Sequence, residues 1–405
     1  MAVGLSAPAS LLPIRGIRLA TCACGLKAED KADLLLMVAD PATQSAAVFT
    51  NNLYCAAPVL IAKDHMQQAA SQAFLVNSGN ANAGTGPEGH ANAIALCEHV
   101  ADSLDLSVEQ VLPFSTGVIS EQLPIEQIHD GIEKLLPALA EDNWLDAAHA
   151  IMTTDTVAKG VSKQCTINDE TITMTGIAKG SGMIHPDMAT MLAYIATDAA
   201  VDPISLQQEI KTVSDATFNC ISVDGDTSTN DAFVVMATGA AGNRLLSPLH
   251  PEWQVFLDTL QSVALELAQS IIRDGEGATR FIEIQIDGGA TVEDCKQVGF
   301  TVAHSPLVKT AFFAGDPNLG RILAAVGRSK VDQLDMQRVS LWIGELSVVE
   351  HGKPSQSYNE QQASDIMAMQ DVTIRLDLGM GDASSCIWTT DLSYDYVKIN
   401  AEYRS

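Results

Sequence analysis

Residues 179–192 read KGSGMIHPDMATML and contain the Ala189–Thr190 step from which the chemistry of this chain can be inferred. Gly180 and Gly182 allow backbone turns that other residues resist, and the small Ala189 leaves its carbonyl within reach of the hydroxyl that follows it. A threonine hydroxyl has no general base of its own, but cleavage of the Ala189–Thr190 bond would give Thr190 an α-amine with a pKa of about 7.7 to 8.0 that can act as one. We therefore predict self-cleavage at this bond, with Thr190 as the nucleophile. A lone Ala-Thr step would also fit a glycine turn that leads into a buried strand.

The composition is that of a globular chain with a large core. The 405 residues are 47% hydrophobic and 18% charged, which allows two or three domains. The net charge is 23 − 50 = −27, which disfavours binding to nucleic acid and to anionic membranes. No apolar run reaches the roughly 18 to 20 residues of a membrane helix, and the first twenty residues, with Pro8 and Pro13, do not resemble a signal peptide. We expect no nucleic acid, no membrane and a cytoplasmic location.

The cysteines and histidines form no pattern typical of a metal or redox site. The eight cysteines include no CxxC pair, so reduced and mostly buried thiols are expected. The nine histidines include no HExxH motif or paired spacing, and His185 is not needed as a base if the α-amine is formed. The glycine-rich residues 77–89 fit no phosphate-binding frame and are expected to form a loop near the site. We expect neither a metal nor another cofactor.

Hydrophobic periodicity predicts strands interleaved with helices. Strands are expected at Thr171 to Ile177, Ala232 to Thr238, Phe281 to Ile286 and Val372 to Leu376, and helices at 90–104, 125–137, 203–217, 253–273 and 359–369. In the helix at 253–273, apolar side chains form one stripe spaced for packing against a sheet. No repeat or flexible linker divides the chain. The sequence therefore predicts a layered α/β (α+β) architecture in one folded unit.

A second short stretch, STGVI (115–119), follows a strand-like run from Val111 to Phe114. We expect a turn here, with a helix starting near Ser120. A Thr-Gly pair in such a turn can direct a hydroxyl and a backbone N–H at one point, which is what an oxyanion needs. From the residues alone, a plain turn is the alternative.

Six motifs occur in one order along the chain. They are MTTDT (152–156), STGVI, KGSGMIHPDMATML, SVDGDTSTND (222–231), GDPNLGRI (315–322) and INAEYRS (399–405). The sequence contains no GxSxG nucleophile elbow of the kind found in α/β-hydrolases. Together the six motifs resemble the ornithine acetyltransferase family, also called glutamate N-acetyltransferases or bifunctional arginine biosynthesis proteins. The chain departs from the family pattern at Leu319, where Trp is favoured, and at Ser405, where Thr is expected and the hydroxyl is kept. The resemblance implies an αββα-like sandwich that cleaves itself.

The resemblance also implies roles for individual residues. Thr190 would be the nucleophile, and Thr116 and Gly117 would form the oxyanion hole. Lys179 would bind the α-carboxylate of an amino acid, and Glu276 would bind its amine. The substrate-binding set implied by the family is Thr153, Thr154, Lys179, Thr190, Glu276, Asn400 and Ser405, with the choice between Thr153 and Thr154 left open.

The implied reaction is a ping-pong acetyl transfer in the cyclic arginine pathway. The acetyl group would pass from N2-acetyl-L-ornithine to Thr190 and then to L-glutamate, and use of acetyl-CoA as a further donor stays open. The cleaved pieces 1–189 and 190–405 would form an α2β2 heterotetramer. Two alternatives remain: a self-cleaving N-terminal-nucleophile aminopeptidase or amidase, which hands the acyl group to water, and a non-catalytic small-molecule binder that stays uncut.

Overall fold

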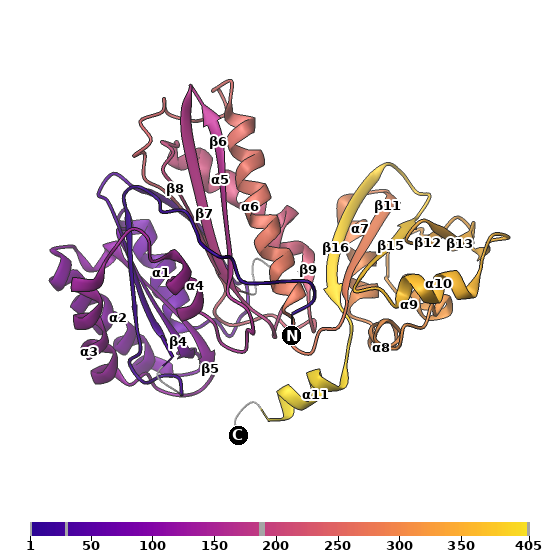
Figure 1. Cartoon of the computed structure of the whole chain (residues 1–405), viewed down its shortest axis with the longest axis horizontal. Helices are drawn as coiled ribbons and strands as arrows, with labels where there is room; N and C mark the ends of the chain where they lie inside the picture. The colour runs from indigo at the N-terminus through magenta and orange to yellow at the C-terminus, as the bar shows by residue number, and fades with distance from the viewer. Residues whose placement is uncertain (1, 29–30, 186–190, 403–405) are drawn as a thin grey trace.

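The computed structural model describes residues 2–28, 31–185 and 191–402. The predicted cleavage point at Ala189 and Thr190 and the predicted pocket residue Ser405 lie outside these ranges. Figure 1 shows most of the chain up to α6 (Trp253–Arg273) in one lobe and residues 281–390 in a second lobe, from which the C-terminal α11 (Tyr394–Ala401) extends back toward the first.

Two sheets pack face to face in the first lobe. One has the order β1 (Ile17–Cys22), β2 (Leu34–Ala39), β4 (Ala73–Asn80) and β5 (Val111–Val118). The other has the order β3 (Gln44–Phe49), β10 (Ala232–Ala237), β8 (Leu192–Thr197), β7 (Glu170–Lys179) and β6 (Lys159–Ile167). A buried cluster joins their inner faces, with Leu35 and Phe114 from the first sheet and Tyr194 and Val234 from the second. This is a sandwich of two sheets.

Helices cover both outer faces of this sandwich. A cluster with Leu96 and Ile132 places α2 (Gly86–Leu104) and α3 (Ile125–Leu135) against the first sheet. A larger cluster with Ile210 and Leu260 places α5 (Pro203–Ala216) and α6 (Trp253–Arg273) against the second. The shorter α1 (Ala57–Gln68) and α4 (Trp144–Ala150) complete the lobe. The layers run helix, sheet, sheet, helix, so the predicted layered α/β architecture and its αββα-like order are confirmed.

A third sheet organises the second lobe (Figure 1). Its order is β14 (Lys353–Pro354), β13 (Leu346–Glu350), β12 (Ser340–Ile343), β15 (Asp371–Asp377), β11 (Phe281–Gly289), β16 (Ala383–Thr390) and β9 (Ile221–Ser222). Its helices are α7 (Val292–Ala303), α8 (Pro306–Ala314), α9 (Leu319–Gly327) and α10 (Glu360–Met367). Because β9 lies in the chain between α5 and β10 yet pairs with β16, the two lobes share a continuous core.

Strand register brings three chain segments to one edge of the second sheet. Lys179 at the end of β7 pairs with Leu192 at the start of β8, and Leu192 also pairs with Ala232 at the start of β10. The stretch 179–192 is therefore the connection between two adjacent strands, next to the SVDGDTSTND motif. A cavity lies at this end of the three strands, lined by Lys179 and by residues 228–230 of that motif.

All four predicted strands and all five predicted helices are present, and 253–273 matches α6 in its bounds. Three expectations need correction. The STGVI stretch is not a turn, because β5 continues through Gly117 to Val118; no helix starts at Ser120, because α3 begins at Ile125. The glycine-rich residues 77–89 form a loop only over 81–85, because β4 continues to Asn80 and α2 begins at Gly86. In addition, the C-terminal helix α11 (Tyr394–Ala401) was not predicted.

The long helix α6 has the length and composition of a membrane-spanning helix but packs in the protein core. Among the described helices it is the one long and apolar enough to cross a membrane by length and composition. However, Phe256, Leu260 and Val263 are fully buried in the core cluster shared with β6 and β7. This is how the core helix of a globular protein packs.

Candidate active site

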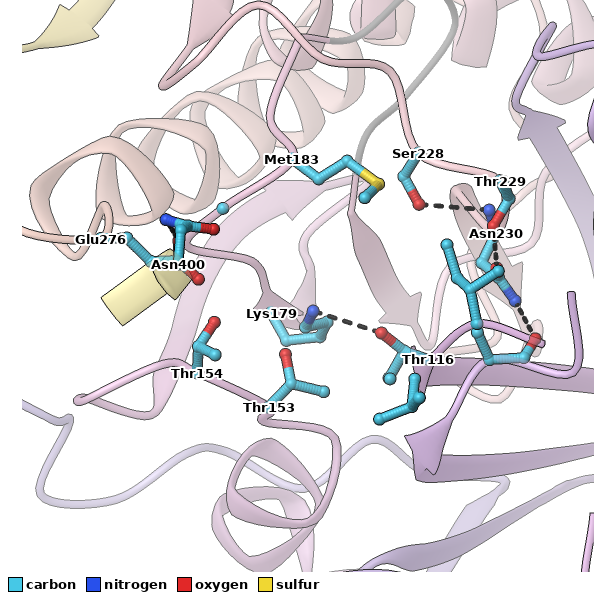
Figure 2. Close-up of a pocket in the computed structure, with 15 residues that line it drawn as sticks. Thr116, Thr153, Thr154, Lys179, Met183, Ser228, Thr229, Asn230, Glu276 and Asn400 are labelled. Carbon is cyan, nitrogen blue, oxygen red and sulfur yellow. Dashed lines mark hydrogen bonds between the residues drawn. The ribbon is translucent and has the colours of Figure 1, made fainter. Parts of the chain in front are cut away.

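A cavity of about 270 Å³ lies where β5, β7 and the loop before β10 meet (Figure 2). Its lining includes every predicted site residue that the structure describes: Thr116, Gly117, Thr153, Thr154, Lys179, Glu276 and Asn400. These residues come from five separate segments of the chain. The fold thus brings the predicted set together in one place.

Lys179, the last residue of β7, provides the cation of the cavity. It is 8% exposed, and its Nζ donates a hydrogen bond of 3.3 Å to Thr116 Oγ1. Burial lowers the pKa of Lys179 below its ordinary value, and the nearby carboxylates of Asp155, Asp231 and Glu276 act in the opposite direction. A buried ammonium that lines a cavity is suited to binding a carboxylate.

Thr116 and Gly117 occupy the end of β5, where it pairs with β4. Gly117 has φ of +134°, and a Cβ at this position would lie 2.2 Å from the carbonyl carbon of Gly79. Only glycine fits this close approach of two backbones. Since Thr116 accepts the hydrogen bond from Lys179, its own hydroxyl proton remains available to donate into the cavity.

Glu276 and Asn400 form the acidic side of the cavity, opposite Thr116 in the view of Figure 2. Asn400 Nδ2, on α11, donates to Glu276 Oε2 at 2.8 Å, and Glu276 N donates to Ser181 O at 2.8 Å. Glu276 is 7% exposed. A Cβ on Gly182 would lie 2.4 Å from Glu276 Oε2, so the glycine makes room for the carboxylate. The C-terminal helix therefore reaches the pocket, as the resemblance implied.

A buried ionic network holds several of these pieces in place. Lys159 Nζ contacts Asp155 Oδ1 at 2.6 Å and Asp274 Oδ2 at 2.7 Å, and all three side chains are at most 1% exposed. Asp155 Oδ1 also accepts from Gly180 N at 2.7 Å, and Asp155 Oδ2 accepts from Thr153 N at 2.9 Å. The network therefore connects the MTTDT loop, the residue after Lys179 and the loop that carries Glu276.

Burial by itself would raise the pKa of Asp155, but the ammonium groups of Lys159 and Lys179 hold it well below its usual range. The sequence analysis missed this network. Asp155 lies within the MTTDT motif and Asp274 two residues before Glu276, but nothing in the sequence indicates that Lys159 contacts both of them.

The end of the SVDGDTSTND motif also lines the cavity, through Ser228, Thr229 and Asn230. Asn230 Nδ2 donates to Ala81 O at 2.6 Å and to Ser115 O at 2.9 Å, so it ties this loop to β5. The motif was recognised from the sequence but no role was given to these residues.

Asp231, the next residue, is buried beside a smaller cavity that it shares with Thr116, Lys179 and Met191. Burial raises the pKa of Asp231 well above its ordinary value, and Lys179 offsets only part of this. Met191 is 2% exposed and is the residue directly after Thr190 in the sequence. The described chain therefore resumes, after 186–190, at the wall of a cavity that contains Thr116 and Lys179.

Among residues 2–28, 31–185 and 191–402, no group of three or more His, Cys, Asp or Glu side chains is arranged to hold a metal ion. The polar side chains that line the cavity carry hydroxyls, amides, one carboxylate and one ammonium. Such a set can bind an amino acid and stabilise an oxyanion.

Comparison with known proteins identifies the family. The model of the ArgJ family matches residues 18–405. The arginine biosynthesis bifunctional protein ArgJ of Psychrobacter arcticus is 46% identical, with 100% of both chains covered, and that of Methylococcus capsulatus is 49% identical over 98% of this chain and 97% of its own. A crystal structure of the ArgJ protein of Bacillus halodurans is 40% identical, with a TM-score of 0.51, and covers 53% of this chain and 100% of its own. The chain therefore belongs to the ArgJ family, and the family, enzyme class and arginine-biosynthesis function predicted from its motifs are confirmed.

Proposed function

We propose that this cavity transfers an acetyl group from N2-acetyl-L-ornithine to L-glutamate. The observation that carries the proposal is that a buried cation, Lys179, and an acid–amide pair, Glu276 and Asn400, line one cavity of about 270 Å³. Lys179 would bind the α-carboxylate that both substrates have, and Glu276 would bind the free amine of N-acetylornithine.

The chemistry would proceed in two steps. Thr190 Oγ attacks the acetyl carbonyl while its own α-amine takes the hydroxyl proton. The Thr116 hydroxyl and the Gly117 N–H stabilise the oxyanion, the α-ammonium returns the proton to the departing ornithine amine, and an acetyl-enzyme remains. The amine of L-glutamate then attacks the same carbonyl, and N-acetylglutamate leaves by the reverse proton path. Use of acetyl-CoA would load the same threonine.

This mechanism requires cleavage before Thr190. Met191, the next residue in the sequence, lines a cavity with Thr116 and Lys179, so the described chain begins again beside the predicted oxyanion hole. One further observation supports the cut itself, because the solved Bacillus halodurans chain is matched completely by 53% of this chain. The piece 190–405 has 216 of 405 residues, which is the same share.

The two pieces would stay together after cleavage. The first piece holds β3 and β7, and the second holds β8 and β10; β3 pairs with β10 and β7 with β8 in continuous ladders. Each piece also brings necessary residues to the cavity, Lys179 from the first and Glu276 from the second. We further propose a cytoplasmic α2β2 heterotetramer, for which light scattering should give about 86 kDa, twice 42.9 kDa.

Intact mass under denaturing conditions is the first test. The protein should separate into pieces of 189 and 216 residues, about 20 and 23 kDa when 42.9 kDa is divided in proportion. Incubation with N-acetylornithine alone should add one acetyl group to the larger piece, and L-glutamate should then remove it as N-acetylglutamate.

Two variants control this experiment. Thr190→Ser keeps a hydroxyl and, once cut, an α-amine, so it should still cleave and transfer, while Thr190→Ala should remain one inactive chain. Release of acetate at the same rate with and without glutamate would instead indicate an amidase. A wild-type chain that stays at 42.9 kDa and carries no acetyl group would leave only the binder alternative.

A further inference from the structure

We infer that the carboxylate of Asp231 is the partner of the α-ammonium that cleavage creates at Thr190, and that it positions this group during acetyl transfer. The inference rests on the proposed function and adds a residue to it. It starts from one buried atom, Asp231 Oδ2, which has no hydrogen-bond partner among residues 2–28, 31–185 and 191–402.

The backbone places Asp231 next to the predicted cleavage point. Asp231 directly precedes β10, which runs parallel to β8 with Ala232 opposite Leu192, and Ala232 N donates to Met191 O at 3.0 Å. Asp231 is thus level with Met191 on the neighbouring strand. An amine released at position 190 would be attached one residue away from this point.

The space beside Asp231 suits one small polar group. The cavity shared by Asp231, Thr116, Lys179 and Met191 measures about 30 Å³, which is room for a water molecule or an ammonium group. A buried carboxylate oxygen without a partner is costly, and native proteins rarely keep one without a role. Asp231 is 3% exposed, so bulk water does not solvate it.

The neighbouring charges leave Asp231 short of a counter-ion. Burial raises the pKa of Asp231, and the Ser228 hydroxyl and the Lys179 ammonium offset only part of this. Cys55, in the segment before α1, has its own pKa raised by burial and by the charge of Asp231. Lys179 gives its hydrogen bond to Thr116, and its charge is shared with Asp155 and Glu276. In the uncut chain, burial therefore favours a neutral Asp231. A new ammonium beside Oδ2 would favour the carboxylate, because opposite charges stabilise each other in a buried site.

The proton balance follows from this pairing. The Thr190 hydroxyl proton moves to the α-amine as Oγ bonds to the acetyl carbon, and Asp231 stabilises the ammonium that results. The ammonium then gives the proton to the departing amine as the C–N bond breaks. Asp231 neither gains nor loses a proton in this sequence; it acts through the α-amine.

The pH dependence of the first half-reaction tests the inference. A carboxylate partner raises the pKa of the amine, so its removal in Asp231→Asn should lower that pKa and shift the acidic limb of kcat/KM for ornithine release to lower pH by about 1 to 3 units. Asp198→Asn is the matched control. Asp198 is also buried, at 2% exposure, but it follows β8 at the opposite end of these parallel strands and pairs with Arg15 at 2.8 Å. This variant should keep the wild-type limb.

The outcomes separate the inference from the function on which it rests. If wild type is neither cut nor acetylated, the proposed function fails first. If the wild-type protein is cut and acetylated, but the acidic limb of kcat/KM in D231N lies at the same pH as in D198N, the proposed role of Asp231 is wrong. If folded D231N stays uncut while D198N is cut, Asp231 acts in cleavage and the pairing with the amine is also wrong. Should D231N not fold, Asp231→Ser, which removes the same charge with a smaller side chain, gives the same comparison.

Discussion

Replacing Lys159 by methionine should destabilise the protein and disorganise its active site together. Lys159 is fully buried between Asp155 and Asp274, at 2.6 Å and 2.7 Å. Removing one partner of a buried ion pair typically costs about 3 to 5 kcal/mol, because the other charge is left uncompensated. Both carboxylates keep backbone donors, Thr153 N to Asp155 and Thr156 N to Asp274, so we take about 4 kcal/mol.

This energy converts into a measurable melting shift. At about 2.1 cal/mol/K per residue, 405 residues unfolding together have an entropy of about 0.85 kcal/mol/K, so the midpoint should fall by about 5 °C. Lys163→Met is the control on the same strand, since its pair with Glu266 is solvent-exposed, with side chains 33% and 55% accessible. Such pairs are worth about 0 to 1 kcal/mol, so the control should melt within about 1 °C of wild type.

Circular dichroism melting of the cut protein is the first assay, and the KM for N-acetylornithine is the second. Because the network anchors Thr153 and Gly180 beside the cavity, Lys159→Met should also raise KM by about tenfold, a loss of about 1.4 kcal/mol. If the variant melts like Lys163→Met, the network does not stabilise the fold. If it melts lower but keeps the wild-type KM, the network does not position the site.

Three further predictions follow from individual contacts. Gly182→Ala should leave the melting temperature nearly unchanged but lower kcat/KM by about tenfold or more, because the new Cβ would lie 2.4 Å from Glu276 Oε2 and displace the carboxylate; steady-state kinetics checks this. Asn400→Ala removes a 2.8 Å hydrogen bond to the same carboxylate, worth about 1.5 kcal/mol, so titration should show roughly tenfold weaker binding of ornithine with the chain still cut. The pKa of Asp155 in the folded protein is lower than its value of about 3.9 in the unfolded chain. The charged carboxylate therefore stabilises the fold above about pH 3.9, and this stabilisation decreases as the pH falls from there toward the folded-state pKa. The melting-temperature gap between wild type and Asp155→Asn should therefore shrink from pH 5 to pH 3, and a gap that stays constant would contradict the assignment.

Periodicity and motifs predicted the elements that depend on local pattern. The helix α6 was predicted with its correct bounds because an apolar stripe with a spacing of about 3.6 residues runs along most of its 21 residues. The alternation in 171–177 identified β7 in the same way. Lys179, Glu276 and Asn400 do line one pocket, as the family resemblance implied, but local pattern carries no information on residues that lie 97 to 221 positions apart.

Features set by long-range packing could not be predicted. Gly117 suggested a turn, yet β5 continues through it because the backbone of Gly79 on β4 approaches too closely for any side chain. Lys159 was not singled out from the sequence, because its burial depends on Asp274, which lies 115 residues away. The α11 helix has no buried residue, so it lacks the apolar stripe by which α6 was found.

The arrangement around Asp224 explains how the site can survive the proposed cut. Asp224 accepts hydrogen bonds from Met183 N at 2.7 Å and from Ile184 N at 2.9 Å, and the hydroxyl of Tyr396 on α11 donates to it at 3.3 Å. A residue of the second piece therefore holds the end of the first piece and the helix that carries Asn400. Val223 N adds a further bond of 2.8 Å to Ile184 O. Since these contacts hold Met183 and Ile184, which precede the proposed cleavage bond, breaking that bond would free Thr190 without releasing the segment that follows Lys179, and the cavity would keep its walls.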